Sequence, residues 1–272
     1  MTSGLSGQFR RSWRWLLTIA MTLLVTSPVT MTATAQLSAP LLPAEERIPV
    51  IVLDPGRGGT DHGAKGPTGL LEKELTLQVA TDTGRLIEGL LGWRVHLTRA
   101  DDTSVPLETR AAFANELGAD LFISIHAGGA LAPVRRDFQV FFFDEWQGSA
   151  PPPLDQSVDS ERFDQVGMQP GGGGAPPKPV PWDRAQVEFV EMSQTFARLL
   201  YRNLRAQVGD EGRGVFGLPI LPLRWVRMPA VLLDLGSLSD PQFADRLRDE
   251  AYVQRVALGI AQAVNDYQAL RR

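Results

Sequence analysis

Five charged or ionisable side chains fall at or beside the ends of segments that the sequence predicts as buried strands. Asp54 and Arg57 follow the first of these strands, His126 ends another, and Asp234 ends the last. Glu72 lies on the loop that leaves the first strand, just before a predicted helix. Ligands of open α/β sheets gather beyond the carboxyl ends of the strands. Taken together, these residues therefore predict a binding or catalytic pocket.

Each residue of this set also has a structural explanation when it is considered alone. Asp54 begins an Asp-Pro-Gly sequence, which is typical of turns. His126 could be a hydrogen-bonded core histidine, and Asp234 could cap the turn after its strand. The convergence of all five at strand ends favours the pocket.

The composition narrows the chemistry that such a pocket could perform. The 272 residues include no cysteine, which excludes a thiolate zinc site, a disulfide and a cysteine nucleophile. A metal ion would need His, Asp or Glu ligands, and the histidines are His62, His96 and His126. The net charge of -4 provides no basic field for a polyphosphate backbone, so we expect no nucleic-acid partner.

Apolar strand patterns and helical patterns alternate along the chain from about residue 48. Predicted strands cover residues 49–54, 93–99, 120–126, 138–143 and 229–234, and predicted helices cover 74–91, 104–117, 185–207 and the region from 240 to the C-terminus. Ser104 is placed to cap the second helix, and Asp240 followed by Pro241 marks the start of a later one. The alternation predicts an α/β fold in which helices flank both faces of an open sheet.

Residues 146–182 interrupt this pattern with runs of proline and glycine. Such a segment cannot bury enough apolar surface to offset the entropy of ordering it. We interpret it as a loop inserted into a single domain that covers residues 48–270. A lid and a plain spacer are the two alternative roles, and the spacer is the commoner one.

The first 35 residues have the features of a secretory signal peptide. Arginines at positions 10, 11 and 14 precede an apolar run from Trp15 to Val25, and Ala-Thr-Ala at 33–35 forms a small-residue cleavage pattern. A spanning helix needs about 20 apolar residues, which favours cleavage over an uncleaved membrane anchor. Residues 36–47 form a polar lead-in. We expect a periplasmic or secreted protein with no stable membrane span after signal removal.

Six segments of the chain, in their order along it, resemble the motifs of the N-acetylmuramoyl-L-alanine amidases of the amidase-3 type. They are Asp54–Gly59, Gly69–Glu74, Thr98–Arg99, Arg110–Asn115, Ser124–Ala127 and Pro229–Gly236. The resemblance implies the family's mixed α/β sheet, of phosphorylase/hydrolase-like architecture. It implies zinc-dependent hydrolysis of the amide between muramic acid and L-alanine in peptidoglycan. Peptidoglycan is then the expected ligand, and a cell-division or wall-remodelling regulator is an expected partner.

The family binds one zinc ion through two histidines and a glutamate, and a second glutamate acts as general acid/base. By resemblance, Glu72 and His126 fall on two of the three ligand positions, and Asp234 falls on the catalytic glutamate with a side chain one methylene shorter. The remaining histidine position holds Arg57, which offers no lone pair and cannot coordinate zinc. His62, five residues later in the same loop, is a candidate replacement ligand.

Two further positions depart from the family pattern close to the same pocket. Gly128 stands where the family has asparagine, and Ser237 stands where it has phenylalanine. Two hypotheses follow. The first is a zinc amidase with a rearranged site. The second is a non-catalytic protein that binds peptidoglycan or regulates its turnover, in which Arg57 takes the metal position and pairs with Glu72. The substitutions favour impaired or lost catalysis and a doubtful zinc site.

Overall fold

The computed structural model describes residues 47–128, 137–145, 185–209 and 212–271. The described residues belong to one compact unit, residues 47–272. The predicted signal peptide, the lead-in up to residue 46 and the predicted loop at 146–182 lie outside the described residues.

A six-stranded mixed sheet forms the centre of this unit, with strand order β2-β1-β3-β6-β4-β5. The strands are β1 (Val50–Pro55), β2 (Arg94–Leu97), β3 (Leu121–His126), β4 (Phe138–Phe143), β5 (Gly212–Leu218) and β6 (Ala230–Asp234). Strands β2, β1, β3 and β6 are parallel to one another, whereas β4 pairs antiparallel with β6 and parallel with β5. The start of β4 therefore lies beside the carboxyl end of β6.

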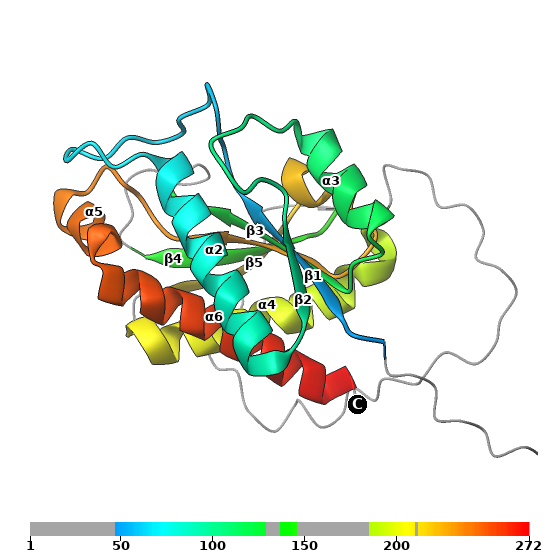
Figure 1. The fold of residues 1–272 in the computed structure, drawn as a ribbon. Coiled ribbons are helices and arrows are strands. Elements are labelled where there is room, and N and C mark those ends of the chain that lie inside the picture. Colours follow the sequence, from blue (N-terminus) through cyan, green and yellow to red (C-terminus); the bar gives the residue numbers. More distant parts are fainter. Residues whose placement is uncertain (1–46, 129–136, 146–184, 210–211, 272) are drawn as a thin grey trace, which may run out of the picture. The chain divides into compact units, whose positions relative to one another are not determined.

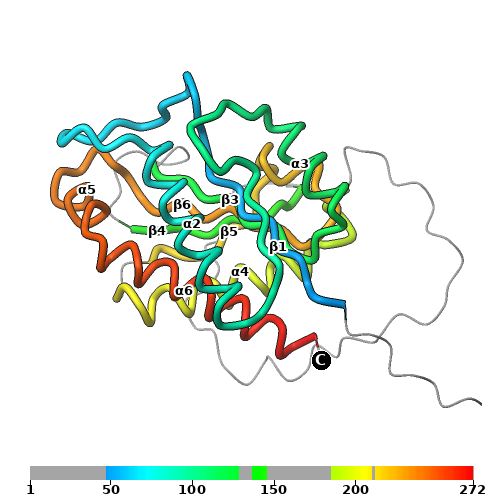
Figure 2. Tube along the Cα trace, in the orientation of Figure 1, coloured from blue at the N-terminus to red at the C-terminus, as the bar shows by residue number. Residues whose placement is uncertain are grey.

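Helices cover both faces of the sheet (Figures 1 and 2), as the sequence predicts. One face packs against α2 (Glu72–Leu91), α4 (Val190–Val208) and α6 (Glu250–Arg271), and α5 (Pro241–Arg248) precedes α6. The other face packs against α3 (Leu107–Glu116) and the short 3-10 helix η4 (Leu221–Leu223). A second 3-10 helix, η3 (Val187–Phe189), leads into α4.

Side-chain alternation along the strands divides the buried residues between these two faces. Ile123 and Ile125 of β3 belong to the core beneath α2, α4 and α6, while Phe122 belongs to the core beneath α3 and η4. By the same alternation, Ser124 and His126 point to the α3 and η4 face of the sheet. The polar residues at the strand ends thus continue one face of an otherwise apolar sheet.

Several boundaries differ from those that the sequence predicts. The first helix begins at Glu72 rather than residue 74, so the residue expected on a loop is the first residue of α2. The second helix begins at Leu107 after Pro106, and Ser104 is not its cap. The expected start of α5 is confirmed, because the side chain of Asp240 accepts a hydrogen bond from the backbone N–H of Phe243, 2.9 Å away.

Candidate functional site

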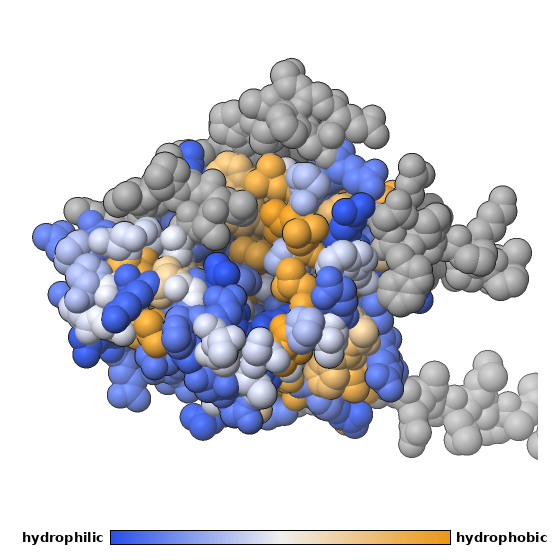
Figure 3. All heavy atoms as spheres, turned by 90° about the horizontal axis from the view of Figure 1, so that it is seen from above, coloured by the Kyte–Doolittle hydropathy of each residue, from blue (hydrophilic) through white to orange (hydrophobic). Residues whose placement is uncertain are grey.

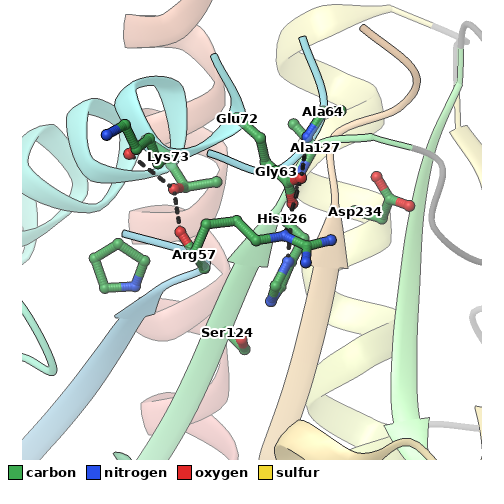
Figure 4. Close-up of polar contacts among 12 residues, drawn as sticks. Arg57, Gly63, Ala64, Glu72, Lys73, Ser124, His126, Ala127 and Asp234 are labelled. Carbon is green, nitrogen blue, oxygen red and sulfur yellow. Dashed lines mark hydrogen bonds and ion pairs between the residues drawn. The ribbon is translucent and has the colours of Figure 1, made fainter. Parts of the chain in front are cut away.

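Glu72 is the centre of a group of polar contacts at the carboxyl ends of β1 and β3 (Figure 4). Its side chain is 1% exposed, and both of its carboxylate oxygens accept hydrogen bonds. Oε2 accepts from the backbone N–H of Ala64 at 2.9 Å, and Oε1 accepts from that of Ala127 at 3.3 Å. A buried carboxylate needs such partners, because an unpaired charge is costly to remove from water.

Arg57 reaches this carboxylate from the loop between β1 and α2 (Figure 4). Its Nε lies 3.1 Å from Glu72 Oε2, and its Nη1 lies 3.4 Å from an oxygen of Asp61. The ion pair expected between Arg57 and Glu72 is therefore confirmed. Arg57 has a φ of 67°, so its backbone adopts the left-handed conformation, which few residues other than glycine and asparagine occupy.

His126 approaches the same carboxylate from the end of β3. Its Nδ1 lies 3.0 Å from Glu72 Oε1. The imidazole ring packs against the loop after β1, where a Cβ on Gly56 would lie only 2.4 Å from His126 Cε1. The absence of a side chain at Gly56 therefore makes room for the ring beside Glu72.

A second ion pair, fully buried, lies at the base of the loop that carries Arg57. Asp54 Oδ1 accepts hydrogen bonds from Arg110 Nη1 at 2.7 Å and from the hydroxyl of Thr98 at 2.6 Å. Asp54 Oδ2 accepts from the hydroxyl of Ser124 at 2.7 Å. Every described contact of Asp54 is thus with the fold itself, which assigns this carboxylate a structural task.

Two arginines hold the backbone of the loop through its carbonyl oxygens. Arg110 donates to the carbonyls of Pro55 and Arg57, each at 2.7 Å. Arg99 donates to the carbonyls of Pro55 at 3.0 Å and Gly56 at 2.8 Å. Three consecutive carbonyl groups are therefore fixed by guanidinium groups that are themselves almost fully buried. This arrangement holds Arg57 in its left-handed conformation.

Asp234 lies on the neighbouring strand, directly opposite His126 in the register of β3 and β6. The residue is 3% exposed, and its Oδ1 accepts a hydrogen bond from the backbone N–H of Gly236 at 3.0 Å. The structure therefore brings Asp234 to the same end of the sheet as Glu72 and His126. In Figure 4 its carboxylate stands apart from the group of contacts around Glu72.

The electrostatic environment keeps the Arg57 and Glu72 pair ionised. Burial alone would raise the pKa of Glu72, but His126, the N–H of Ala64 and the charge of Arg57 together leave that pKa below its usual value. Burial alone would lower the pKa of Arg57, but the charges of Glu72 and Asp61 leave it above its usual value. Each partner favours the charged form of the other.

Among the described residues, no three His, Asp or Glu side chains come together in a group that could hold a metal ion. His62 is exposed on the loop before α2, and the structure does not bring it to Glu72 and His126. His96 lies on edge strand β2 and packs edge-on against Phe113, with ring centroids 6.3 Å apart.

The donor set at Glu72 does not fit a zinc site. Glu72 and His126 provide two of the three ligands that such a site needs. By the family resemblance the third position falls on Arg57, whose guanidinium has no lone pair and donates to Glu72 Oε2. A fixed positive charge thus stands beside the carboxylate that a metal would require.

Sequence reasoning did not find some of the residues that build this site. Asp61 is the second partner of Arg57, and Lys73 holds the tip of the same loop by donating to the carbonyl of Gly59 at 2.9 Å and to Asp102 at 2.6 Å. Arg99 and Arg110 belong to segments that resemble the family's motifs, but their contacts are separated by up to 56 residues in sequence. Local sequence patterns do not predict hydrogen bonds between residues so far apart in the chain.

Comparison with known proteins places most of the described unit in one family. The family model described as N-acetylmuramoyl-L-alanine amidase matches residues 51–266. The chain is 34% identical over 224 residues to the amidase AmiC of Neisseria meningitidis serogroup B, covering 81% of this chain and 53% of that protein. It is 30% identical over 219 residues to the amidase AmiA of Escherichia coli, covering 80% and 75%. This chain thus spans about half the length of the Neisseria protein.

Solved structures give the same result for the fold. An N-acetylmuramoyl-L-alanine amidase from Clostridium difficile 630 superimposes with a TM-score of 0.60 at 24% identity, over 81% of this chain and 97% of that one. The catalytic domain of CwlV from Bacillus (Paenibacillus) polymyxa gives 0.58 at 25% identity, over 82% and 99%. The match from residue 51 to residue 266, together with these relatives, shows that the chain belongs to the N-acetylmuramoyl-L-alanine amidase family.

Proposed function

We propose that this chain is an exported member of the amidase family that binds peptidoglycan, and that its zinc-dependent hydrolysis is impaired or lost. The observation that carries the proposal is the 3.1 Å contact between Arg57 Nε and Glu72 Oε2. The guanidinium provides the positive charge that Glu72 needs without providing a Lewis acid. Catalysis through a metal requires an ion with an open coordination position, and an arginine has none.

The charge balance of the pair supports this proposal. Removing one partner of a buried ion pair leaves an uncompensated charge, whereas replacing one cation by another does not. Arg57 therefore allows Glu72 to remain ionised and buried in the absence of zinc. The chain keeps the family's fold and keeps polar residues at the strand ends, namely Glu72, His126 and Asp234. These features favour continued binding of peptidoglycan.

Export is supported by the N-terminal sequence and by a relative, 27% identical over 219 residues, that is named a probable cell wall amidase, LytH of Staphylococcus aureus. The features of residues 1–35 are those of a signal peptide. Within the described residues, no helix is both long enough and apolar enough to cross a membrane. We place the protein in the periplasm or in the secreted fraction.

A regulatory partner is a second element of the proposal. The CwlD amidase from Clostridioides difficile, solved in complex with the GerS lipoprotein, has a fold similar to this chain with a TM-score of 0.60 at 22% identity. A non-catalytic member of the family can serve wall turnover by binding either the wall or a regulator of wall remodelling. Residues 129–136 and 146–184 lie outside the described structure, so no partner surface is assigned to them.

The direct test measures zinc and hydrolysis in the same preparation. The purified protein is assayed for zinc by mass spectrometry and for release of peptides from purified peptidoglycan. We expect less than stoichiometric zinc, little or no release of peptide, and sedimentation of the protein with the insoluble wall. Stoichiometric zinc together with amidase products would establish the alternative hypothesis, an active amidase with a rearranged site.

A variant that restores the family's residue types should gain the activity that the unaltered chain lacks, and so provides a second test of the proposal. Arg57→His combined with Asp234→Glu restores the residue types of the family pattern at both positions. We expect this double variant to bind zinc and to gain hydrolysis over the unaltered chain. Arg85→His is a matched control, because Arg85 is an exposed arginine of α2 that pairs with Asp82 at 3.4 Å. Equal activity of the unaltered chain and the double variant would contradict the proposal.

A further inference from the structure

Gln139 is a buried polar residue that neither the fold nor the Arg57 site uses. It is the second residue of β4, where its neighbours in the strand are phenylalanines and a valine. The residue is only 4% exposed. Within the described part of the chain, its side-chain amide makes no hydrogen bond.

Burying an amide without a hydrogen-bond partner costs free energy, and folded proteins pair nearly all such groups. The other buried glutamine of the described residues illustrates the normal case. Gln186 donates from Nε2 to the carbonyls of Val226 at 2.6 Å and Met228 at 2.8 Å. Gln139 therefore lacks the structural reason that explains Gln186.

The position of Gln139 points to the strand-end site. Gln139 lies directly opposite Asp234 in the antiparallel pairing of β4 and β6, and Asp234 lies opposite His126 in the pairing of β6 and β3. Residues directly opposite in neighbouring strands point to the same face of a sheet, with Cβ atoms about 5 Å apart. Gln139, Asp234 and His126 therefore form one row across three strands.

The side chain of Gln139 is buried but not completely enclosed. The fully enclosed side-chain polar atoms that lack a partner belong, among the described residues, to Thr83, Trp93 and Tyr267. Gln139 is not one of them, so its amide is not completely enclosed by the described residues. On β5, the position paired with Gln139 is Gly214, which adds no side chain to the row. Figure 3 shows the molecule from above, and the surface on this side is hollowed.

We infer that Gln139 is a ligand-binding residue whose side chain hydrogen-bonds an amide group of the peptidoglycan ligand beside Asp234. A carboxamide offers one acceptor oxygen and two donor hydrogens, which match the N–H and C=O of a secondary amide. Asp234 adds a carboxylate that can accept a second N–H. Muramyl peptides contain amides in the N-acetyl group and in every peptide bond. The inference rests on the proposed function, since that function supplies the ligand.

Replacing Gln139 with methionine tests this inference. Gln139→Met keeps the length of the side chain and removes the hydrogen-bonding groups. Because the amide has no hydrogen-bond partner among the described residues, we expect the midpoint of thermal unfolding to stay the same or to rise. In calorimetric titration with N-acetylmuramoyl-L-alanine, we expect the Kd to rise about tenfold, the effect of losing one or two hydrogen bonds.

Gln207→Met is the matched control, because Gln207 lies on α4 and pairs with Gln262 of α6 on the opposite face of the sheet. This control should leave the Kd unchanged. Gln139→Leu provides a second apolar replacement. If both Gln139 variants unfold at lower temperature, the amide has a structural role and the inference is overturned.

The outcomes for the inference and for the proposed function can be told apart. If the unaltered chain binds the muramyl probe and Gln139→Met binds it equally well, the inference is wrong and the proposed function stands. If the unaltered chain binds neither the probe nor purified peptidoglycan, the proposed function fails and the inference fails with it. A rise in Kd that is confined to the Gln139 variants supports both.

Discussion

Arg110 and Asp54 form a buried ion pair, 2.7 Å between Nη1 and Oδ1, and the same guanidinium donates to the carbonyl of Arg57. One side chain of α3 thus connects the end of β1 to the residue that faces Glu72. The geometry of the candidate site depends on this pair, although neither residue contacts Glu72 in the described structure.

Arg110→Met should be strongly destabilising. It would leave Asp54 as a buried carboxylate without its ionic partner and would remove the guanidinium donor of the Arg57 carbonyl, while the carbonyl of Pro55 would keep its hydrogen bond from Arg99. Breaking a buried ion pair of this kind costs about 3–5 kcal/mol. Urea unfolding followed by circular dichroism measures the loss. The double variant Arg110→Met with Asp54→Asn should recover part of it. A double variant that is less stable than Arg110→Met would show that the charge of Asp54 is not the cause.

Arg57→Met should lower stability by a smaller amount. Glu72 would lose its cationic partner but would keep its hydrogen bonds to Ala64, Ala127 and His126. Arg57 is 32% exposed, so solvent screens part of the interaction, and we expect a loss of about 1–2 kcal/mol. Adding Glu72→Gln should make the loss smaller. Equal unfolding midpoints for Arg57→Met and the unaltered chain would contradict the importance of this pair.

Gly56→Ala should disturb the position of His126. The added Cβ would lie within 2.4 Å of the imidazole ring, so the ring or the loop must move. We expect a loss of about 1–3 kcal/mol and a changed chemical shift for the His126 ring protons in NMR. Gly89→Ala on α2 is the control, because a Cβ there meets no atom within 4 Å. Alanine in a helix should stabilise the chain by about 0.5–1 kcal/mol.

The buried phenol of Tyr267 should make the free energy of unfolding fall at high pH. Burial raises the pKa of its phenol from 10.0 to about 12. Between these values the unfolded state has lost the proton while the folded state retains it. The free energy of unfolding should therefore fall as the pH rises from 10 towards 12, by roughly 3 kcal/mol in total.

Tyr267→Phe should remove this part of the pH dependence without loss at neutral pH. The hydroxyl of Tyr267 makes no hydrogen bond within the described part of the chain, so its removal breaks none there. Ultraviolet titration of the three tyrosines should show one phenol that ionises late in the unaltered chain and is absent in the variant. Three phenols that ionise together would contradict the assignment.

The regular parts of the fold were predictable because they follow local patterns. Strands such as β1 and β3 are short apolar segments, and α5 begins at an Asp-Pro sequence. β5 was not predicted. Its sequence Gly-Arg-Gly-Val-Phe-Gly-Leu has three glycines and only three apolar residues, so it does not resemble a strand by propensity. The backbone hydrogen bonds to β4 on one side stabilise β5 as a strand although its own sequence has a low strand propensity.

The site was predictable only where a side chain faces its partner across a single loop. The pairing of Arg57 with Glu72 followed from the family resemblance, which puts Arg57 at a metal-ligand position beside Glu72, and it is confirmed. The hydrogen bonds from Arg99 and Arg110 to the carbonyls of residues 55–57 could not be predicted from the sequence. They form only when α3 and the segment after β2 pack near the end of β1. The roles of Asp234 as a catalytic residue and of His62 as a ligand remain predictions.

The left-handed backbone at Arg57 has a consequence for how this position can change over time. Histidine is among the residues that tolerate a positive φ better than most, and the buried Arg99 and Arg110 bind residues 55–57 only through their main-chain oxygens. The hydrogen bonds that hold the backbone of residues 55–57 thus do not involve the side chain at residue 57. During evolution, a metal-binding histidine at this position could be replaced by arginine, whose charge is part of the side chain. The reverse replacement is equally accessible. Either one needs a change in a single codon and leaves the loop backbone in place.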